Sequence, residues 1–136
     1  MIEITKDRID VARIIAAVSD SGAGGIDVFI GTTRNKTQGK AVVKLDFEAY
    51  EPMAIKELQK IVDRAKSQWP ILKYAISHRT GVVEIGEEAV VIAVSTAHRQ
   101  AAFESCKFII DELKKTVPIW KKEIFEDGDV WVAAHP

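Results

Sequence analysis

The sequence contains few of the residues that mark a secreted, metal-binding or membrane protein. Its 136 residues include one cysteine, Cys106, and three scattered histidines, which excludes an internal disulfide and gives no zinc-binding pattern. No apolar run approaches the roughly 18 to 20 residues of a membrane span, and the opening MIEITKDRID lacks the layout of a signal peptide. We therefore expect a cytoplasmic protein that needs no metal or cofactor.

A net charge is also nearly absent. Lysine and arginine number 19 against 20 acidic residues, so the formal charge is -1. This balance gives no general attraction to nucleic acid or to an anionic membrane, and any anion-binding site must come from local clusters. Because 47% of the residues are hydrophobic and no repeat or linker interrupts the chain, residues 1–136 are expected to form one domain.

The hydrophobic pattern predicts an α+β fold with a mostly antiparallel sheet and about three helices. Apolar residues recur at helical spacing, between proline and glycine boundaries, in residues 7–18, 52–69 and 96–116. Strand patterns occupy residues 26–31, 41–50, 71–78, 81–86 and 88–95, and two more strands flank the Asp-Gly turn at 127–128. Residues 32–40 between them are polar and basic and are expected to form a loop. Strands predominate and most neighbours can pair as hairpins, which favours the α+β class.

Two elements show which side chains should face the core. Strict alternation in residues 41–50 predicts an inward face made of Ala41, Val43, Leu45 and Phe47. Helical spacing in residues 96–116 predicts a buried stripe made of Ala102, Cys106, Ile109, Ile110 and Leu113. The cysteine is therefore expected to be a core residue without a chemical role.

The first basic cluster, Arg34, Lys36 and Lys40, lies in the predicted loop between Gly31 and Gly39. These glycines would let the backbone approach an anion. However, their spacing matches neither the phosphate-binding loop nor the dinucleotide fingerprint. The sequence favours a solvated surface loop as the explanation of the cluster, and anion binding stays open as the alternative.

The second basic cluster is the pair His98 and Arg99, in the first turn of the helix expected at 96–116, which Ser95 or Thr96 would cap. Cations are disfavoured at a helix N-terminus, and a bound phosphate would remove that conflict. The alternative is that both side chains face solvent or pair with carboxylates. A separate His-Arg pair at residues 78–79, at a strand-to-turn boundary, is expected to have a structural role.

The third basic cluster combines Lys114 and Lys115, near the end of that helix, with Lys121 and Lys122 just beyond Pro118. Lysines near a helix C-terminus interact favourably with the helix dipole, which explains the first pair without a functional role. Strand alternation places Lys121 and Lys122 on opposite, largely apolar faces. A lysine near apolar surface and other cations has a lowered pKa, which suits proton transfer, but this reasoning does not select one of the four.

The length of the last helix limits how these clusters can combine. Arg99 and Lys114 are fifteen residues apart, so at about 1.5 Å per residue they are separated by more than ~20 Å. One small ligand cannot contact both within one chain. If both belong to one site, that site is shared between two copies, most simply in a two-fold dimer.

Several segments between about Ile26 and Trp131 have a distinctive order, namely GTTRNKTQG, LDFEAYEPMA, HRTGVVEIGEEAVVIAVSTAHRQAAFESCKFIIDELKKTVPIWKKE and DGDVWV. Together they resemble a known family, the large, catalytic subunit of molybdopterin synthase, called MoaE. The most specific parts of the resemblance are the patterns SxxHRxxAF and LKxxxPIWKKE. The resemblance implies an α+β fold of the α/β-hammerhead type.

The resemblance also implies an activity, that of a sulfurtransferase in molybdenum cofactor biosynthesis. The family converts cyclic pyranopterin monophosphate into molybdopterin by adding two sulfurs as a dithiolene. The sulfur arrives as a thiocarboxylate at the Gly-Gly C-terminus of a small ubiquitin-like, MoaD-like carrier subunit. The family's assembly is a heterotetramer built on a homodimer of large subunits, and its pocket draws on both protomers.

Carried over residue by residue, the resemblance implies a set of site residues. The two pocket lysines fall on Lys114 and Lys121, which are the expected catalytic residues. Substrate-binding positions fall on Arg34, His98 and Arg99, with Lys115 and Lys122 as supporting charges and His135 where the family has an arginine. The alternative function is a non-catalytic phosphometabolite-binding module, which would not need a small protein partner.

Overall fold

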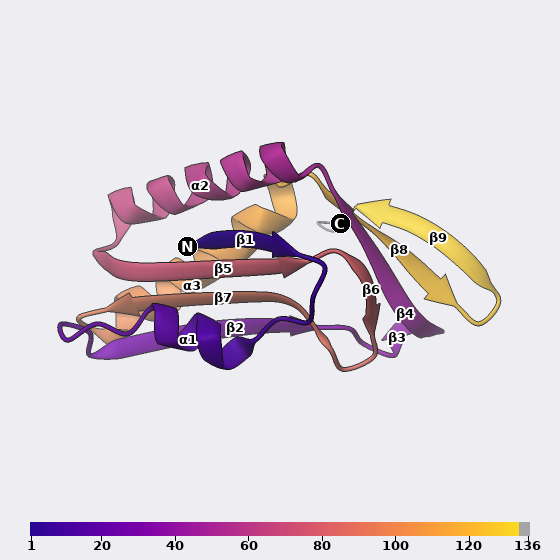
Figure 1. Ribbon diagram of the computed structural model, residues 1–136, viewed down its shortest axis with the longest axis horizontal. Helices are drawn as coiled ribbons and strands as arrows, with labels where there is room; N and C mark the ends of the chain where they lie inside the picture. Colours follow the sequence, from indigo (N-terminus) through magenta and orange to yellow (C-terminus); the bar gives the residue numbers. More distant parts are fainter. Residues whose placement is uncertain (134–136) are drawn as a thin grey trace.

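This computed structural model describes the backbone of residues 1–133 and the side chains of residues 1–128. The described residues form three helices and nine strands, arranged in two sheets (Figure 1). The helices are α1 (Val11–Ala17), α2 (Glu51–Gln68) and α3 (Arg99–Thr116). The strands are β1 (Ile2–Thr5), β2 (Gly25–Thr32), β3 (Lys36–Thr37), β4 (Lys40–Ala49), β5 (Ile71–Arg79), β6 (Gly81–Glu84), β7 (Glu88–Thr96), β8 (Ile119–Phe125) and β9 (Gly128–Ala133).

The first sheet has the strand order β1-β5-β7-β2 and is covered on both faces (Figure 1). β7 lies in its middle and alternates between two cores, with Ile92 and Val94 facing the larger cluster and Val91 and Ala93 the smaller. Helices α2 and α3 supply the larger cluster, and Ile14 of α1 lies in the smaller one. Because both faces are buried, β7 is a continuous apolar run, as is typical of a strand between two layers.

The second sheet lies at one end of the first and has the order β3-β4-β8-β9, with β6 paired to β4 (Figure 1). Strand β6 follows β5 directly after Thr80, so one turn carries the chain from the first sheet to the second. Gly81 adopts φ +82 at this turn, a conformation that side chains other than glycine rarely take. The end of β5 and the strands β4 and β8 are thereby brought next to each other.

Most predicted elements are present, and the α+β class is confirmed. Three local features differ from the prediction. Strand β1 was not predicted, and it pairs in parallel with β5. The polar segment 32–40 is a short hairpin in which β3 pairs with the start of β4. Helix α3 begins at Arg99 with His98 as N-cap, so the predicted cap at Ser95 or Thr96 is wrong; β7 extends through Thr96, whose hydroxyl donates to the His98 carbonyl at 2.6 Å.

The alternation predicted for β4 is correct in only half of the strand. Phe47 is buried and Leu45 half-buried, but Val43 is 43% exposed and Val42 is buried in its place. The pairing with β8 shifts register between Val42 and Lys44, and such a β-bulge moves every side chain before it to the opposite face. Ala41 is exposed for the same reason.

The stripe predicted for α3 is confirmed, since all five residues, including Cys106, are buried. The start of the helix lies close to the first residues of β2. A side-chain carbon on Gly24 would be 2.3 Å from the carbonyl oxygen of Ala97, and one on Gly25 would be 3.0 Å from the Cα of Arg99. These two glycines therefore allow β2 to begin against the turn that carries His98 and Arg99. Within residues 1–133, no helix has both the length and the apolarity to cross a membrane.

Candidate functional site

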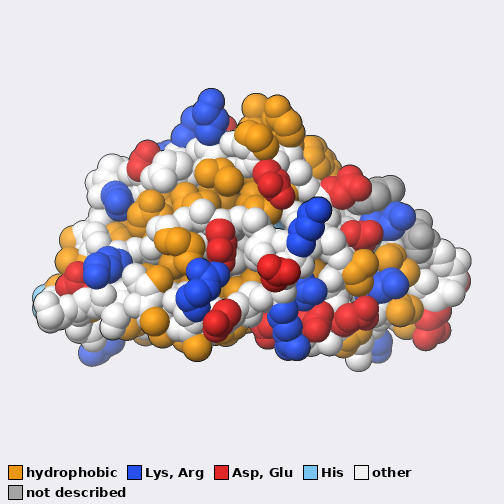
Figure 2. All heavy atoms as spheres, viewed as in Figure 1, with side chains coloured by type: hydrophobic (Ala, Val, Ile, Leu, Met, Phe, Trp, Pro, Cys, Tyr) orange, Lys and Arg blue, Asp and Glu red, His pale blue; other side chains and the backbone are white. Residues whose placement is uncertain are grey.

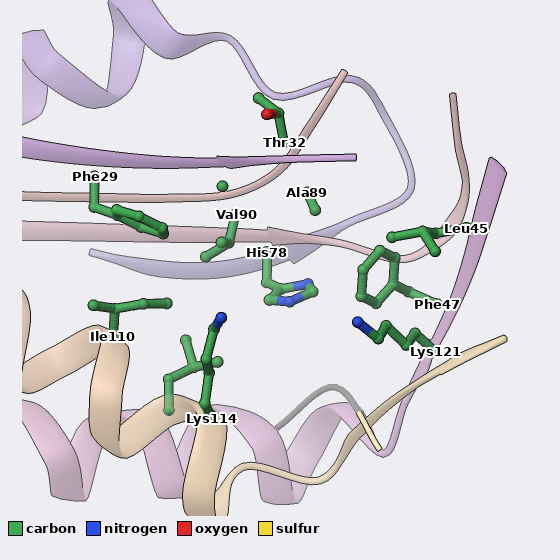
Figure 3. A pocket seen from close by; sticks show the side chains of 12 residues that line it. Phe29, Thr32, Leu45, Phe47, His78, Ala89, Val90, Ile110, Lys114 and Lys121 are labelled. Atoms are coloured by element: carbon green, nitrogen blue, oxygen red, sulfur yellow. The ribbon is translucent and has the colours of Figure 1, made fainter. Parts of the chain in front are cut away.

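A cavity of about 120 Å³ lies where the two sheets and the last turns of α3 meet (Figure 3). Its walls are largely apolar and include Phe29, Leu45, Phe47, Val90, Ile110 and Leu113. Three titratable side chains also line it, namely His78, Lys114 and Lys121. The cavity thus combines a low-polarity wall with two cations.

The two lysines reach the cavity from different elements. Lys114 follows buried Leu113 in the last turn of α3. Lys121 lies on β8, opposite Phe47 of β4, on the strand face that also carries buried Ile119 and Glu123. Figure 3 shows both side chains extending into the cavity towards the ring of His78. The predicted convergence of positions 114 and 121 therefore exists within one chain.

The environment of Lys121 lowers its pKa below the ordinary value for lysine. The main cause is desolvation, because the side chain is only 23% exposed. The cations of Lys114 and Arg34 lower it further, whereas the carboxylate of Glu123, 3.8 Å away, raises it. One oxygen of that carboxylate, Oε2, has no hydrogen-bond partner among the described residues. Lys121 is thus a half-buried amine inside a cluster of cations.

Arg34 belongs to this cluster electrostatically, although its side chain is exposed. Of the other cations in its segment, Lys40 pairs with Asp127 at 3.7 Å and lies over the ring of Phe125, and Lys36 is exposed. The loop cluster therefore contributes one cation, Arg34, whose charge reaches Lys121, although Arg34 does not line the cavity.

His78 also lines the cavity, although the sequence analysis expected only a structural role for it. Its side chain is 3% exposed, and its ring meets Phe47 edge-on with centroids 5.2 Å apart. Nδ1 lies 2.8 Å from the carbonyl oxygen of Arg79. Burial lowers the pKa of His78 to about 4, against a smaller raising effect of that hydrogen bond. The imidazole is therefore neutral near pH 7.

Arg79, in contrast, has the structural role predicted for it. Its guanidinium donates to Glu87 at 3.0 Å, and Glu87 also pairs with Arg8 at 3.5 Å. The pattern of neighbouring residues could not separate His78 from Arg79. Strand alternation separates them, because consecutive side chains point to opposite faces of the sheet. It must be combined with knowledge of which face meets the second sheet.

His98 and Arg99 lie at the opposite end of α3, exposed to solvent. The helix rise separates them from Lys114 by more than ~20 Å, so one chain does not bring them to the cavity. His98 makes no capping hydrogen bond with its side chain. His98 and Arg99 therefore lie at the start of α3, at a distance from the lysines, and anion binding there stays a prediction.

The remaining predicted positions lie outside the cavity. Lys115 is exposed and pairs with Glu112 at 3.2 Å, one turn back on α3. Lys122 lies on β8 opposite Asp46 of β4, on the strand face that points away from Lys121. His135 lies outside the described residues.

The surface around these features is mixed in charge. Figure 2 shows lysine and arginine interspersed with aspartate and glutamate over the face that it views. Among the side chains of residues 1–128, no three histidine, cysteine or acidic groups come together as metal ligands would. The chemistry available to the cavity is that of its amines, its imidazole and its apolar wall. It can hold an anionic group on a narrow, uncharged stem and stabilise negative charge on it.

Comparison with known proteins gives one consistent family. Residues 4–116 match the family model described as MoaE protein. The molybdopterin synthase catalytic subunit of Bacillus subtilis is 51% identical over 130 residues, covering 96% of this chain and 83% of that protein. The crystal structure of molybdopterin synthase from Staphylococcus aureus superposes on this structure with a TM-score of 0.91 at 39% identity. The match covers 96% of this chain and 95% of the Staphylococcus chain.

A more distant structure shares the fold. It is the complex of subunits 1 and 2 of molybdopterin-converting factor from Helicobacter pylori, with a TM-score of 0.79 at 22% identity over 96% of this chain and 89% of that chain. The family model covers most of the chain, and the Bacillus relative agrees with it over nearly the full length. The chain therefore belongs to the MoaE family.

Proposed function

We propose that this chain is the catalytic subunit of a molybdopterin synthase, a sulfurtransferase of molybdenum cofactor biosynthesis. It transfers sulfur from the C-terminal thiocarboxylate of a small ubiquitin-like carrier to cyclic pyranopterin monophosphate, which becomes the dithiolene of molybdopterin. The observation that carries the proposal is the cavity in which Lys114 and Lys121 meet between apolar walls. The names of the relatives support the same activity.

The cavity suits the end of the proposed carrier. A Gly-Gly tail has no side chains, so it is thin enough to enter a narrow apolar space as an extended chain. Its thiocarboxylate is an anion, which the ammonium groups of Lys114 and Lys121 attract, and the partial burial of Lys121 beside apolar walls strengthens that attraction. Arg34 adds positive charge near Lys121. The Helicobacter complex supports a second subunit as partner.

The proposed reaction begins when the carrier sulfur attacks a carbon of the pterin precursor and displaces an oxygen substituent, so that a carbon–sulfur bond forms as a carbon–oxygen bond breaks and its electron pair leaves with the oxygen. The acyl group of the carrier is then joined to the pterin through that sulfur as a thioester. Water hydrolyses the acyl–sulfur bond, so that the sulfur stays on the pterin and the carrier leaves as a carboxylate. Lys121 and Lys114 stabilise the negative charge that develops on the acyl oxygen. The lowered pKa of Lys121 also suits it to moving protons.

The phosphate of the precursor requires cations besides these lysines. Arg34 is near Lys121, and His98 and Arg99 are at the far end of α3. We propose that the three grip the phosphate together, with the helix N-terminus supplied by a second copy of the chain. This arrangement makes a homodimer the core of a heterotetramer that includes two carriers. Lys115 and Lys122 would add supporting charge.

Reconstitution tests the proposal. The purified chain is mixed with thiocarboxylated carrier and cyclic pyranopterin monophosphate, and the dithiolene product is measured by mass spectrometry. Lys121→Ala should reduce the rate by about 10²–10³-fold, as expected when a group that stabilises an oxyanion is removed. Lys60→Ala is the matched control, since Lys60 is exposed on α2 and pairs only with Glu57, and it should leave the rate unchanged.

Two outcomes would contradict the proposal. One is a wild-type chain that forms no product with the thiocarboxylated carrier. The other is a Lys121→Ala protein that keeps the full rate, which would remove Lys121 from the chemistry. Tight binding of the phosphorylated precursor with no binding of the carrier would instead favour a phosphometabolite-binding module.

A further inference from the structure

The cavity contains one titratable group to which the proposed reaction has so far given no role, the imidazole of His78. Its ring lies between the ammonium groups of Lys114 and Lys121 in the view of Figure 3, and all three side chains line the same cavity. A fully protonated amine donates hydrogen bonds and accepts none. As long as the two lysines are protonated, His78 therefore differs from them in being able to accept a proton.

The hydrogen bonding of His78 fixes which ring nitrogen is available. Nδ1 lies 2.8 Å from the carbonyl oxygen of Arg79, and a carbonyl only accepts, so Nδ1 must carry the proton. The lone pair of the neutral ring is then on Nε2. No hydrogen-bond partner for Nε2 occurs in the part of the chain that the structure describes. The edge-on contact with Phe47 holds the ring in this orientation.

The other polar groups nearby are poor candidates for accepting a proton. Thr32 offers only a hydroxyl, and Glu123 is buried at 6% exposure next to Lys121 without lining the cavity. The cavity volume of about 120 Å³ exceeds the roughly 10–15 Å³ that one water needs, so a tail end and a water fit together. Hydrolysis of the thioester needs such a water and a base beside it.

We propose that His78 is the general base for the hydrolysis that releases the carrier, with Nε2 removing a proton from the attacking water. This inference rests on the proposed function. The lysines and the histidine that line the cavity then have separate tasks. The lysines stabilise charge on the acyl oxygen, and the imidazole activates water.

In this hydrolysis, each bond that forms is matched by a bond that breaks. The water oxygen bonds to the acyl carbon while Nε2 takes its proton, and the acyl–sulfur bond then breaks with its electron pair going to sulfur. The sulfur remains on the pterin as a thiolate, and the carrier leaves as a carboxylic acid that loses its remaining proton to solvent and becomes a carboxylate. His78, now protonated between two cations, returns its proton to the thiolate or to solvent. Its low pKa, about 4, keeps it unprotonated before the step and favours this return.

The test is a single-turnover reaction of His78→Gln with thiocarboxylated carrier and precursor, quenched and analysed by intact mass. Glutamine places an amide near the position of Nε2 but cannot take up a proton. We expect the covalent carrier–pterin thioester to accumulate and its hydrolysis to slow by about 10²–10⁴-fold. Ser77→Ala is the matched control, because Ser77 is buried on the same strand with its side chain on the opposite face, and it should accumulate no adduct.

A His78→Gln protein that folds, binds carrier and releases it at the wild-type rate overturns the inference. Loss of activity without adduct also overturns it, because the variant would then block an earlier step. If the wild type itself makes no product, the proposed function has failed instead. Should His78→Gln not fold, nitrogen NMR of the wild type decides: a proton on Nε2 with Nδ1 bare refutes the proposal, and an unprotonated Nε2 that responds to carrier binding supports it.

Discussion

The buried imidazole of His78 should make the stability of the protein fall as the pH is lowered from 7 to 5. Its pKa is about 4 in the folded protein, against 6.5 for an ordinary histidine. In that interval the unfolded chain binds a proton at this position and the folded chain does not, so protons favour unfolding. Stability from this group is present above pH 6.5 and is lost progressively between 6.5 and 4.

The two pKa values give the size of the effect. The free energy of unfolding should be about 2 kcal/mol lower at pH 5 than at pH 7 through this residue, and about 3 kcal/mol lower at pH 4. Desolvation of the buried ring is the cause of this shift, and the hydrogen bond to the Arg79 carbonyl opposes it in part. The pKa values of Glu87 and Glu112 are lowered as well, but carboxylates lose their charge mainly below pH 5.

Urea unfolding of the wild type and of His78→Gln, each at pH 7 and pH 5, measures the effect. The quantity of interest is the change between the two pH values, since all other groups contribute equally to both proteins. The wild type should lose about 2 kcal/mol more than the variant. Equal losses would refute the reasoning, because they would mean that His78 titrates normally and is not held neutral by burial.

Three further predictions concern packing and burial. Gly24→Ala should cost about 1–3 kcal/mol in thermal or urea unfolding, because its side chain would collide with the backbone carbonyl of Ala97, in the turn before α3. Gly22→Ala meets only side-chain atoms and should cost less. Burial and the nearby Asp27 carboxylate raise the pKa of Cys106 to about 12, so its thiol should resist alkylation in the native state, and Cys106→Ala should keep activity in the reconstituted assay. Val42→Ala should cost about 2 kcal/mol and Val43→Ala under about 0.5 kcal/mol, and the reverse order would contradict the β-bulge.

The sequence predicted most of the fold because its elements are strongly patterned and clearly bounded. The α3 stripe shows this, since helical spacing alone identified five of the six buried residues of the helix, all but Ser105. The prediction for β4 was wrong before Lys44 because a bulge depends on the partner strand, β8, and leaves no mark in local alternation. Strand β1 was missed because four residues are too short to show a period.

The candidate site, like the fold, could be predicted from the sequence only in part. Alternation in β8 is enough to separate Lys121 from Lys122, and the length of α3 is enough to separate Arg99 from Lys114. Both results are consequences of backbone geometry, which the chain carries in its local order. The family resemblance added which of the lysines to select.

Only the tertiary structure decided what surrounds those residues. It placed the end of β5 against β4 and β8, so that His78 shares a cavity with Lys114 and Lys121 and loses its contact with water. A pKa depends on burial and on charges contributed by elements far away in the sequence, which no local pattern encodes. The sequence by itself determined which groups are present and which way each one faces along its own strand or helix. Packing determined which of them meet, and therefore which can act together.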